Sequence, residues 1–362
     1  MKLLLVGTNR GGGGTESHFI TLAAALADAG HDVSAAVWPE EFIHRALARH
    51  PRVRLFPLRL VARYDVRGAL ELSRIVRAVR PDWLVGAFKR EYWPVAVVGR
   101  RRRVPVVLFS HLDQRFHPTM TFALPRLVRR IVAPTEYLRR RLVERGMPAA
   151  KLAVLPNPVD TAHFRPDPGA RAEMRTRLRF ADDDVVVGFV GRQERGKGVM
   201  ALADSVRAAM DADPRVRMLW VGHPGDERTE LREVVERSPH AARHAWEPWT
   251  ADVAPYFAAM DVCTLPSIGP ETFGRVLAEA QACGVPVLGS ALGGIPEAMR
   301  DGVTGRLLPP ADVLAWTAAI RALAADAELR ARMGREGRAF VEREFAAPRV
   351  TERFVEQLRA WR

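Results

Sequence analysis

The sequence predicts an α/β protein in which parallel sheets are covered by helices and divided between two domains. Apolar runs too short for helices alternate with amphipathic stretches along the whole chain, a pattern typical of strands joined by helical crossovers. The chain has 362 residues, 48% of them hydrophobic, which is enough to bury two cores of ordinary domain size. Residues 155–169 are dense in proline and turn residues and predict a domain boundary.

The order of the expected elements follows from the apolar runs. In the first half, strands are expected near residues 2–6, 33–37, 53–56, 83–87, 105–109 and 131–133. A second series begins at Val185, and a last helix is expected over roughly residues 348–361. These elements predict a first domain over residues 1–165 and a second over residues 170–345.

A glycine-rich loop follows the first expected strand. Residues 7–16 read Gly-Thr-Asn-Arg-Gly-Gly-Gly-Gly-Thr-Glu, and an apolar helix is expected to continue through Leu26 and to stop at Gly30. The glycines do not form the dinucleotide-binding pattern Gly-x-Gly-x-x-Gly, because the sixth position counted from Gly12 is Ser17. A structural turn explains this run as well as a ligand-binding loop does.

A second loop presents two cations directly after an apolar run. In residues 185–198, Val-Val-Val-Gly-Phe-Val-Gly-Arg-Gln-Glu-Arg-Gly-Lys-Gly, the run ends at Gly191 and the loop presents Arg192 and Lys197. Beside a nucleotide, these cations would neutralise a diphosphate leaving group and stabilise the charge that develops on it. The loop also matches most of a P-loop, but Gly198 stands where the magnesium-binding Ser or Thr belongs, and no later strand ends in the expected Asp. The sequence therefore disfavours an ATPase.

Two carboxylates frame the expected start of a buried helix. In residues 266–279, Pro-Ser-Ile-Gly-Pro-Glu-Thr-Phe-Gly-Arg-Val-Leu-Ala-Glu, Glu271 and Glu279 lie eight positions apart, and eight helical residues advance roughly 12 Å, about the separation of sugar and ribose in a nucleotide sugar. A diphosphate between them would accept hydrogen bonds from unpaired first-turn N–H groups. The expected donors are those of Thr272, Phe273 and Gly274, and the glycine permits close approach. The alternative is that Glu271 caps the helix and Glu279 is a solvated charge.

The following segment strengthens the first of these interpretations. Residues 284–297, Gly-Val-Pro-Val-Leu-Gly-Ser-Ala-Leu-Gly-Gly-Ile-Pro-Glu, predict a buried strand, a second glycine turn and another helix start. Together with residues 266–279 they resemble the signature region of the family 4 glycosyltransferases, which are retaining enzymes of the GT-B fold. Thr272 stands where that family more often has Gly, and Pro158 replaces the usual Gly of the family's hinge.

The resemblance covers nearly the whole chain and implies both a fold and a division of labour. The fold is α/β, with two Rossmann-like domains whose parallel sheets face each other across a cleft. A C-terminal helix, residues 346–362, is expected to cross back onto the first domain. The first domain would bind the acceptor and the second the nucleotide sugar.

The resemblance also implies roles for individual residues. Glu271 would contact the donor sugar and Glu279 the ribose, while Arg192 and Lys197 would bind the diphosphate. The glycine loop would face the donor phosphates, through Gly13 and Gly14.

His111 is a further candidate, at the carboxyl end of an expected strand in residues 106–113, where ligands of open α/β sheets bind. A lone histidine more often has a packing role, but the resemblance implies contact with the donor sugar. The other nine histidines are scattered without metal-ligand spacing, and residues 182–184, Asp-Asp-Asp, are expected to form a solvated turn. No metal and no cofactor other than the nucleotide sugar is therefore expected.

Charge is distributed unevenly along the chain. Residues 1–165 hold 28 Lys and Arg against 13 Asp and Glu, a net charge of +15, whereas the remainder holds 27 against 29, a net charge of −2. The basic clusters are Arg100 to Arg103 and Arg126, Arg129, Arg130, Arg139, Arg140 and Arg141. They are candidates for binding an anionic membrane surface, and the alternative is that they form a solvated basic face. Nucleic acid is disfavoured, because no aromatic stacking platform or known binding motif accompanies the charge.

The composition favours a cytoplasmic protein. Cys263 and Cys283 lie in apolar segments and are expected to be reduced core residues. Without a run of about 18 apolar residues, neither a membrane span nor a signal peptide is expected. Any membrane association would be peripheral, on the inner face.

The sequence as a whole predicts a metal-independent retaining glycosyltransferase. It would transfer a sugar from a UDP- or GDP-linked donor to the hydroxyl of a glycan, a lipid-linked sugar or a small molecule, in the synthesis of cell-surface polysaccharide, lipopolysaccharide or glycolipid. The expected catalytic residues are His111, Glu271, Arg192 and Lys197. The alternatives are a phosphorylase or synthase of the same fold, and a non-catalytic protein that binds sugar nucleotides.

Overall fold

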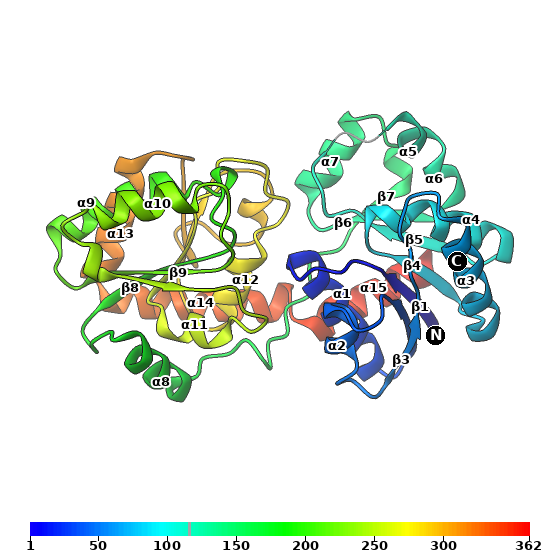
Figure 1. Cartoon of the computed structure of the whole chain (residues 1–362), viewed down its shortest axis with the longest axis horizontal. Coiled ribbons are helices and arrows are strands. Elements are labelled where there is room, and N and C mark those ends of the chain that lie inside the picture. Colours follow the sequence, from blue (N-terminus) through cyan, green and yellow to red (C-terminus); the bar gives the residue numbers. More distant parts are fainter. Residues whose placement is uncertain (115–116) are drawn as a thin grey trace. The chain divides into compact units, whose positions relative to one another are not determined.

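The chain folds into two compact units, each built around one parallel sheet. The computed structural model describes residues 1–114 and 117–362. The first unit comprises Met1–Pro158 and Ala346–Arg362, and the second comprises Val159–Phe345 (Figure 1). Their sheets have seven and six strands. The expected fold class, α/β with two Rossmann-like domains, is therefore confirmed.

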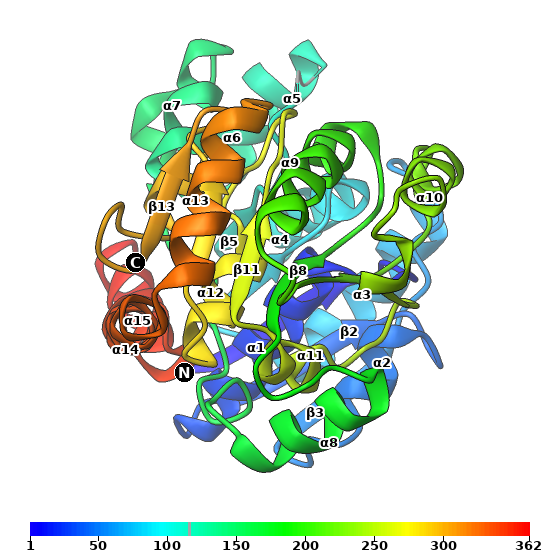
Figure 2. The same cartoon turned by 90° about the vertical axis from the view of Figure 1, so that its left-hand side faces the viewer.

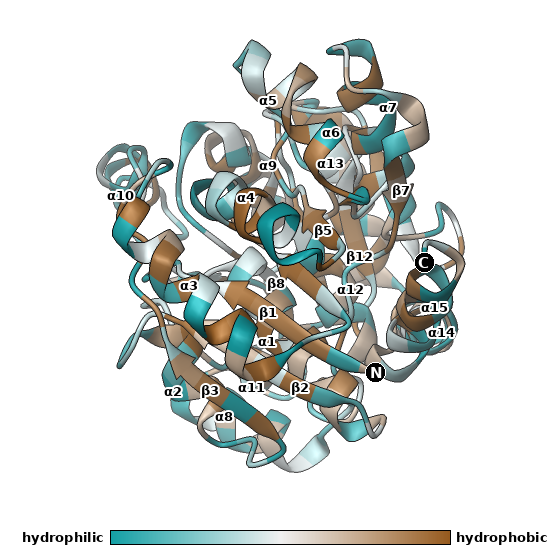
Figure 3. Ribbon diagram, turned by 90° about the vertical axis from the view of Figure 1, so that its right-hand side faces the viewer, coloured by the Kyte–Doolittle hydropathy of each residue, from teal (hydrophilic) through white to brown (hydrophobic). Residues whose placement is uncertain are grey.

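The first sheet has the strand order β3-β2-β1-β4-β5-β6-β7. Its strands are β1 (Lys2–Gly7), β2 (Asp32–Val37), β3 (Val53–Pro57), β4 (Trp83–Gly86), β5 (Val106–Phe109), β6 (Arg130–Ala133) and β7 (Leu152–Val154). All neighbours are parallel, so the carboxyl ends of the strands share one edge. The six expected strands form, and Figure 3 shows the apolar character of β1. Only β7 was not expected, because its three residues adjoin the proline-rich segment.

Helices cover both faces of this sheet. They are α1 (Gly14–Asp28), α2 (Phe42–Leu47), α3 (Val66–Val79), α4 (Tyr92–Arg102), α5 (Pro118–Phe122), α6 (Leu124–Leu127), α7 (Glu136–Glu144) and α15 (Ala347–Ala360). The last of these packs on α1, and its Phe354 ring lies 5.4 Å from the ring of Phe109, the last residue of β5. Arg129 Nη2 donates to the carbonyl oxygen of Arg362 at 2.9 Å and fixes the end of the helix. The chain thus returns to the first unit after completing the second.

The second sheet has the order β10-β9-β8-β11-β12-β13 and is also parallel. Its strands are β8 (Val185–Val190), β9 (Val216–Val221), β10 (His244–Glu247), β11 (Val262–Leu265), β12 (Val287–Ser290) and β13 (Gly305–Leu308). Its helices are α8 (Pro168–Leu178), α9 (Val199–Ala212), α10 (Arg228–Glu236), α11 (Ala254–Ala259), α12 (Arg275–Ala282), α13 (Val313–Ala325) and α14 (Ala327–Glu344). Figure 2 shows α9 and α13 side by side.

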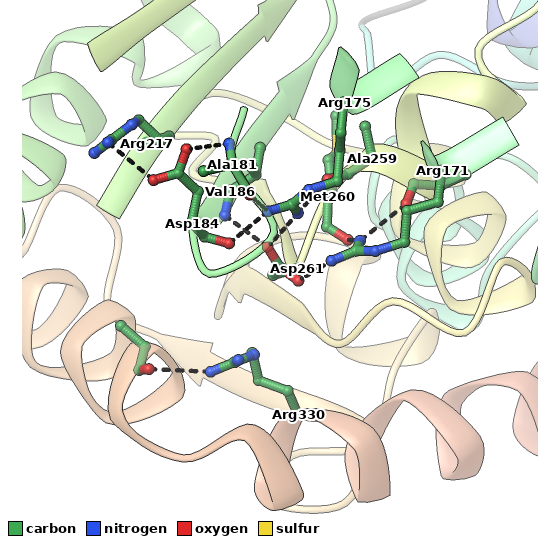
Figure 4. Close-up of polar contacts among 12 residues, drawn as sticks. Arg171, Arg175, Ala181, Asp184, Val186, Arg217, Ala259, Met260, Asp261 and Arg330 are labelled. Atoms are coloured by element: carbon green, nitrogen blue, oxygen red, sulfur yellow. Dashed lines mark hydrogen bonds and ion pairs between the residues drawn. The ribbon is translucent and has the colours of Figure 1, made fainter. Parts of the chain in front are cut away.

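A buried arginine network attaches α8 to this sheet (Figure 4). Arg175 is 3% exposed, and its guanidinium lies 3.1 Å from Asp261, which Arg171 also contacts at 2.7 Å. Beside it, Asp184 forms an ion pair with Arg217 at 2.9 Å. Only part of the expected solvated turn at residues 182–184 is therefore solvated, because Asp184 is buried against this network.

Candidate active site

The strand order of the second sheet reverses at β8, and this position defines the candidate site. The strands β9 and β10 follow on one side of β8, and the strands from β11 to β13 follow on the other. Ligands of open α/β sheets bind at such a switch point. The two loops that follow β8 and β11 meet there. The backbone N–H groups of Ile268 and Gly269 both donate to the carbonyl oxygen of Gly196, at 3.0 and 2.9 Å.

An ion pair between these loops joins two residues that the sequence singled out. Lys197 Nζ lies 2.5 Å from Glu271 Oε2, and the two side chains are 24% and 16% exposed. Lys197 ends a short 3-10 helix, Arg195–Lys197. The pair is therefore held in place yet accessible, and it presents one positive and one negative group at the switch point.

Arg192 lies in the same loop but is not joined to this pair. Its side chain is 67% exposed and binds Glu194 at 3.2 Å. Of the two expected phosphate-binding cations, the structure therefore places Lys197 in contact with Glu271 and leaves Arg192 mainly in solvent.

The start of α12 differs from the expectation. The helix begins at Arg275, and Gly274 is its N-cap at a left-handed φ of +90°, which ends the helix on that side. Thr272, Phe273 and Gly274 thus lie in the turn before the helix and not in its first turn. Glu271 therefore lies outside the helix, and the rise expected for eight helical residues between Glu271 and Glu279 applies only from Arg275 onward. The Phe273 side chain is 2% exposed in the core, so only its backbone is available to a ligand.

Glu271 does not cap the helix, because no side-chain bond caps α12. Its backbone is instead braced by the second glycine turn. Gly294 N donates to the Glu271 carbonyl oxygen at 2.8 Å, and a Cβ on Gly293 would lie 2.2 Å from that same oxygen. Glycine at this position therefore allows the two segments of the predicted signature region to touch.

Glu279 is buried on α12, so its interpretation as a solvated charge is wrong. The residue is 6% exposed, and its Oε1 lies 2.6 Å from the Nε of Arg275. Burial raises the pKa of Glu279 above its ordinary value, and Arg275 opposes that rise. The sequence analysis missed Arg275, although its i,i+4 spacing from Glu279 was a readable signal.

The glycine loop of the first unit also lies at a switch point, between β1 and β4. Gly13 is the N-cap of α1 and Gly14 its first residue, and both are exposed. Glu91 ties the two loops together, because its carboxylate accepts hydrogen bonds from Thr8 N and Oγ1 and from the N–H groups that follow β4, all at 2.9 Å. Burial raises the pKa of Glu91 to about 7, and these four bonds oppose the rise.

His111 follows β5 at the same edge of the first sheet and contacts the helix that begins at Gly14. Its ring lies 4.6 Å from that of His18 in an edge-to-face arrangement, and His18 is 1% exposed. The sequence analysis missed His18, whose signal is a polar residue on the buried face of α1, one turn after the glycines. Asp113 anchors the next part of the loop through Arg145, at 2.5 Å.

The two basic clusters differ in structure. Arg100 to Arg103 are exposed at the end of α4, and none of them forms an ion pair with any residue in 1–114 or 117–362. In the second cluster, Arg139 binds Glu136 and Arg141 binds Glu144, each at 2.6 Å. The second cluster is therefore partly neutralised within the chain.

Other expectations concern groups outside these loops. Within the described residues, no three His, Cys, Asp or Glu side chains are grouped so that they could hold a metal ion. In the same part of the chain, no helix has the length and apolarity to cross a membrane. Cys263 and Cys283 are free and buried, and burial raises the pKa of both thiols, that of Cys283 to about 12.

Comparisons with known proteins show which family this chain resembles. Residues 12–163 match the family model described as Glycosyltransferase Family 4, and residues 184–326 match Glycosyl transferases group 1. The chain is 34% identical over 272 residues to a D-inositol 3-phosphate glycosyltransferase of Mycobacterium marinum, covering 70% of this chain and 56% of the relative. It is 36% identical over 231 residues to that of Kineococcus radiotolerans, covering 57% and 51%. The chain spans about half the length of the curated relatives it matches.

Solved structures share the fold. Anabaena Alr3699/HepE superimposes with a TM-score of 0.86 at 21% identity, over 99% of this chain and 100% of that one. WaaG, a glycosyltransferase involved in lipopolysaccharide biosynthesis, gives 0.70 at 16% identity, over 96% and 97%. These likenesses and the two Rossmann-like units confirm the GT-B fold class. With one family model matched in each half, the chain belongs to the family 4 glycosyltransferases, also called glycosyl transferases group 1.

Proposed function

We propose that this protein is a retaining glycosyltransferase that transfers a sugar from a UDP- or GDP-linked donor to an acceptor hydroxyl without a metal ion. The observation that carries the proposal is the ion pair of Lys197 and Glu271 at the switch point of the second sheet. A nucleotide sugar needs a cation that binds its diphosphate and a hydrogen-bond acceptor for its sugar hydroxyls. Lys197 supplies the cation and Glu271 the hydrogen-bond acceptor, with Nζ and Oε2 2.5 Å apart.

The other candidate residues complete the proposed donor site. Arg192, on the exposed loop, would turn toward the diphosphate, and the backbone of Thr272, Phe273 and Gly274 would donate hydrogen bonds to it. Glu279 would bind the ribose from α12. In the first unit, His111 would contact the sugar, and Gly13 and Gly14 would approach the phosphates.

The reaction needs no protein nucleophile in this proposal. The bond between the anomeric carbon and the diphosphate oxygen breaks, and the acceptor oxygen bonds to that carbon on the same face. The acceptor proton passes to the leaving diphosphate. Lys197 and Arg192 stabilise the charge that develops on that leaving group.

We assign donor binding to the second unit and acceptor binding to the first. The support for a nucleotide sugar is that Anabaena Alr3699/HepE was solved with UDP and glucose. The support for a hydroxylated acceptor is the name of the curated relatives, D-inositol 3-phosphate glycosyltransferase. The acceptor of this chain would be a glycan, a lipid-linked sugar or a phosphorylated small molecule of that kind, in the synthesis of a cell-surface polysaccharide, lipopolysaccharide or glycolipid.

We further propose a cytoplasmic location with peripheral contact to the inner membrane face. The exposed cluster Arg100 to Arg103 supports it, since anionic lipid attracts such a group. Sedimentation with anionic vesicles should be strong at low salt and fade as the Debye length falls to about 8 Å. Replacing Arg100 to Arg103, or Arg139 to Arg141, with Gln should weaken it, because each substitution removes one positive charge even where a Glu is paired with the Arg. Undiminished binding in both variants, or no vesicle binding by the wild type, would contradict the proposal.

The central test is a calorimetric screen of the full chain against UDP, GDP, ADP and their sugars, followed by an assay of donor hydrolysis. We expect one uridine or guanosine diphosphate sugar to bind and to be turned over slowly without added metal. Binding without hydrolysis or transfer to any sugar acceptor would instead support a non-catalytic protein. Absence of binding by every nucleotide would refute the donor site.

A further inference from the structure

One arginine on α14 binds the end of the helix that carries Glu279. Arg338 Nη1 donates to the carbonyl oxygen of Ala282 at 2.7 Å, and Ala282 is the last residue of α12. The final carbonyl groups of a helix lack partners within the helix, and a cation beside them also interacts favourably with the helix dipole. Arg338 therefore fixes the C-terminal end of α12, about 4.5 Å along the helix axis from Glu279.

The same guanidinium joins α12 to the turn at which the chain enters the second unit. Its Nη1 also donates to the carbonyl oxygen of Phe164 at 2.6 Å, and its Nη2 donates to that of Thr161 at 3.0 Å. Its Nε donates to Glu342 Oε1 at 2.6 Å. The planar guanidinium thus holds these partners in a fixed geometry that the ammonium group of a lysine could not reproduce. The Arg338 side chain is only 22% exposed.

Two glycines let α14 lie directly against α12. A Cβ on Gly334 would lie 2.0 Å from the carbonyl oxygen of Gly284, which follows α12. A Cβ on Gly337 would lie 3.1 Å from Cγ of Gln281, within α12. Because Gly337 directly precedes Arg338, the close approach of the two helices and the arginine contacts occur at the same place. A shift of α12 relative to α14 would break both.

The turn that Arg338 binds also lies near Glu279. His163 is in this turn, between the two carbonyl groups that accept hydrogen bonds from Arg338. Burial raises the pKa of Glu279, and the charges of Arg275 and His163 oppose that rise. His163 is therefore close enough to act on the Glu279 carboxylate, so a displacement of the turn would change the surroundings of that carboxylate.

Resting on the proposed function, in which Glu279 binds the donor ribose, we infer that Arg338 is a positioning residue for nucleotide binding. It acts through Glu279, because it holds the end of α12 and the turn at residues 160–164 at one fixed separation. A binding group must stay within about 0.5 Å of its productive position to keep its hydrogen bonds. Lys197, proposed for the diphosphate, lies instead on the loop after β8. The effect of Arg338 therefore falls on the nucleoside part of the donor.

The test compares nucleoside diphosphates with inorganic diphosphate, measured by calorimetry on the full chain. Arg338→Gln is expected to weaken UDP or GDP binding by about 3- to 10-fold, which is a part of the roughly 10- to 150-fold that complete loss of a charged hydrogen bond would cost. Affinity for inorganic diphosphate, which has no ribose, should remain that of the wild type. Arg338→Lys should recover only part of the loss, since lysine keeps the charge without the planar fork. Arg335→Gln is the matched control, because Arg335 is exposed on the same helix.

Two further variants show whether Arg338 acts through α12 and Glu279. Gly337→Ala keeps the arginine but adds a methyl group 3.1 Å from Gln281, so it should also weaken UDP or GDP binding and spare diphosphate. It serves in place of Arg338→Gln if that variant does not fold. In a Glu279→Gln protein, Arg338→Gln should cost little further affinity, because the carboxylate on which it acts is gone.

The outcomes separate the positioning role from the function on which it rests. Unchanged UDP and GDP affinity in folded Arg338→Gln or Gly337→Ala protein would overturn the inference while the donor site stands. Equal loss of diphosphate and nucleotide affinity would also overturn it, since Arg338 would then support the second unit as a whole. Strictly additive losses in the double variant Arg338→Gln, Glu279→Gln would have the same meaning. Failure of the wild type to bind any nucleoside diphosphate would overturn the proposed function and this inference together.

Discussion

Removal of the Lys197 charge should show what the ion pair does. In the structure Lys197 Nζ lies 2.5 Å from Glu271, and neither side chain is more than a quarter exposed. A charge-assisted hydrogen bond from Lys197 to the donor diphosphate would contribute roughly 1.5 to 3 kcal/mol. The Lys197→Ala variant is therefore expected to lose about 10- to 150-fold in kcat/KM.

The ion pair also predicts the sign of the coupling free energy between Lys197 and Glu271 in a double-mutant cycle. Without Lys197, the Glu271 carboxylate would face the diphosphate unpaired. At a separation of about 6 Å and an effective dielectric constant of about 20, this repulsion approaches 3 kcal/mol, and solvent reduces it. The double variant Lys197→Ala, Glu271→Gln should therefore bind UDP or GDP more tightly than Lys197→Ala alone.

Calorimetry with UDP and GDP and steady-state donor consumption measure these effects, and thermal unfolding checks that each variant folds. Lys2→Ala is the matched control, because it removes the charge of a lysine in β1, on the first unit. Wild-type kcat/KM in Lys197→Ala would refute the role of the lysine. Strictly additive losses in the double variant would refute the repulsion between Glu271 and the diphosphate.

Three further predictions concern other sites. Glu279→Gln should mainly weaken nucleotide binding, whereas Glu271→Gln should lower kcat more than it raises KM; equal loss of free UDP or GDP affinity would contradict this division. Gln193 is fully buried and its amide finds no partner among the described residues, so Gln193→Met should raise the free energy of unfolding in urea by roughly 1 to 3 kcal/mol, and a decrease would contradict this. Burial lowers the pKa of His244 from 6.5 to about 4, so the unfolded chain alone binds that proton between these values. Stability should fall by up to about 3 kcal/mol as pH drops through this window, and His244→Asn should remove that part of the pH dependence.

Much of the fold could be predicted because parallel strands are buried on both faces and appear as short apolar runs. The run that ends at Val190 and the run that ends at Leu265 were both legible, and so were the loops after them. The sequence could not show that these two strands are neighbours. Lys197 and Glu271 are 74 positions apart, and only the strand order brings them together.

The errors at the site also have local physical causes. Nothing in the sequence specifies the left-handed φ of Gly274, which moves the start of α12 by several residues. The contact between His18 and His111 depends on two elements packing at one edge of the first sheet. Pairing of Arg139 within its own helix was legible from its spacing to Glu136, but charge counting alone overlooked it.

The return of α15 to the first unit has a consequence for biosynthesis. The second unit is inserted into the first, and its entry and exit touch, since Val159 N donates to the Phe345 carbonyl oxygen at 2.8 Å. During translation, the seven-stranded sheet emerges first but cannot receive α15 until the whole insert has been synthesised. The inserted unit, whose chain is continuous, can complete its core earlier. Until α15 has been synthesised, the first unit is therefore incomplete, and the surface around Phe109 that α15 covers stays exposed to solvent.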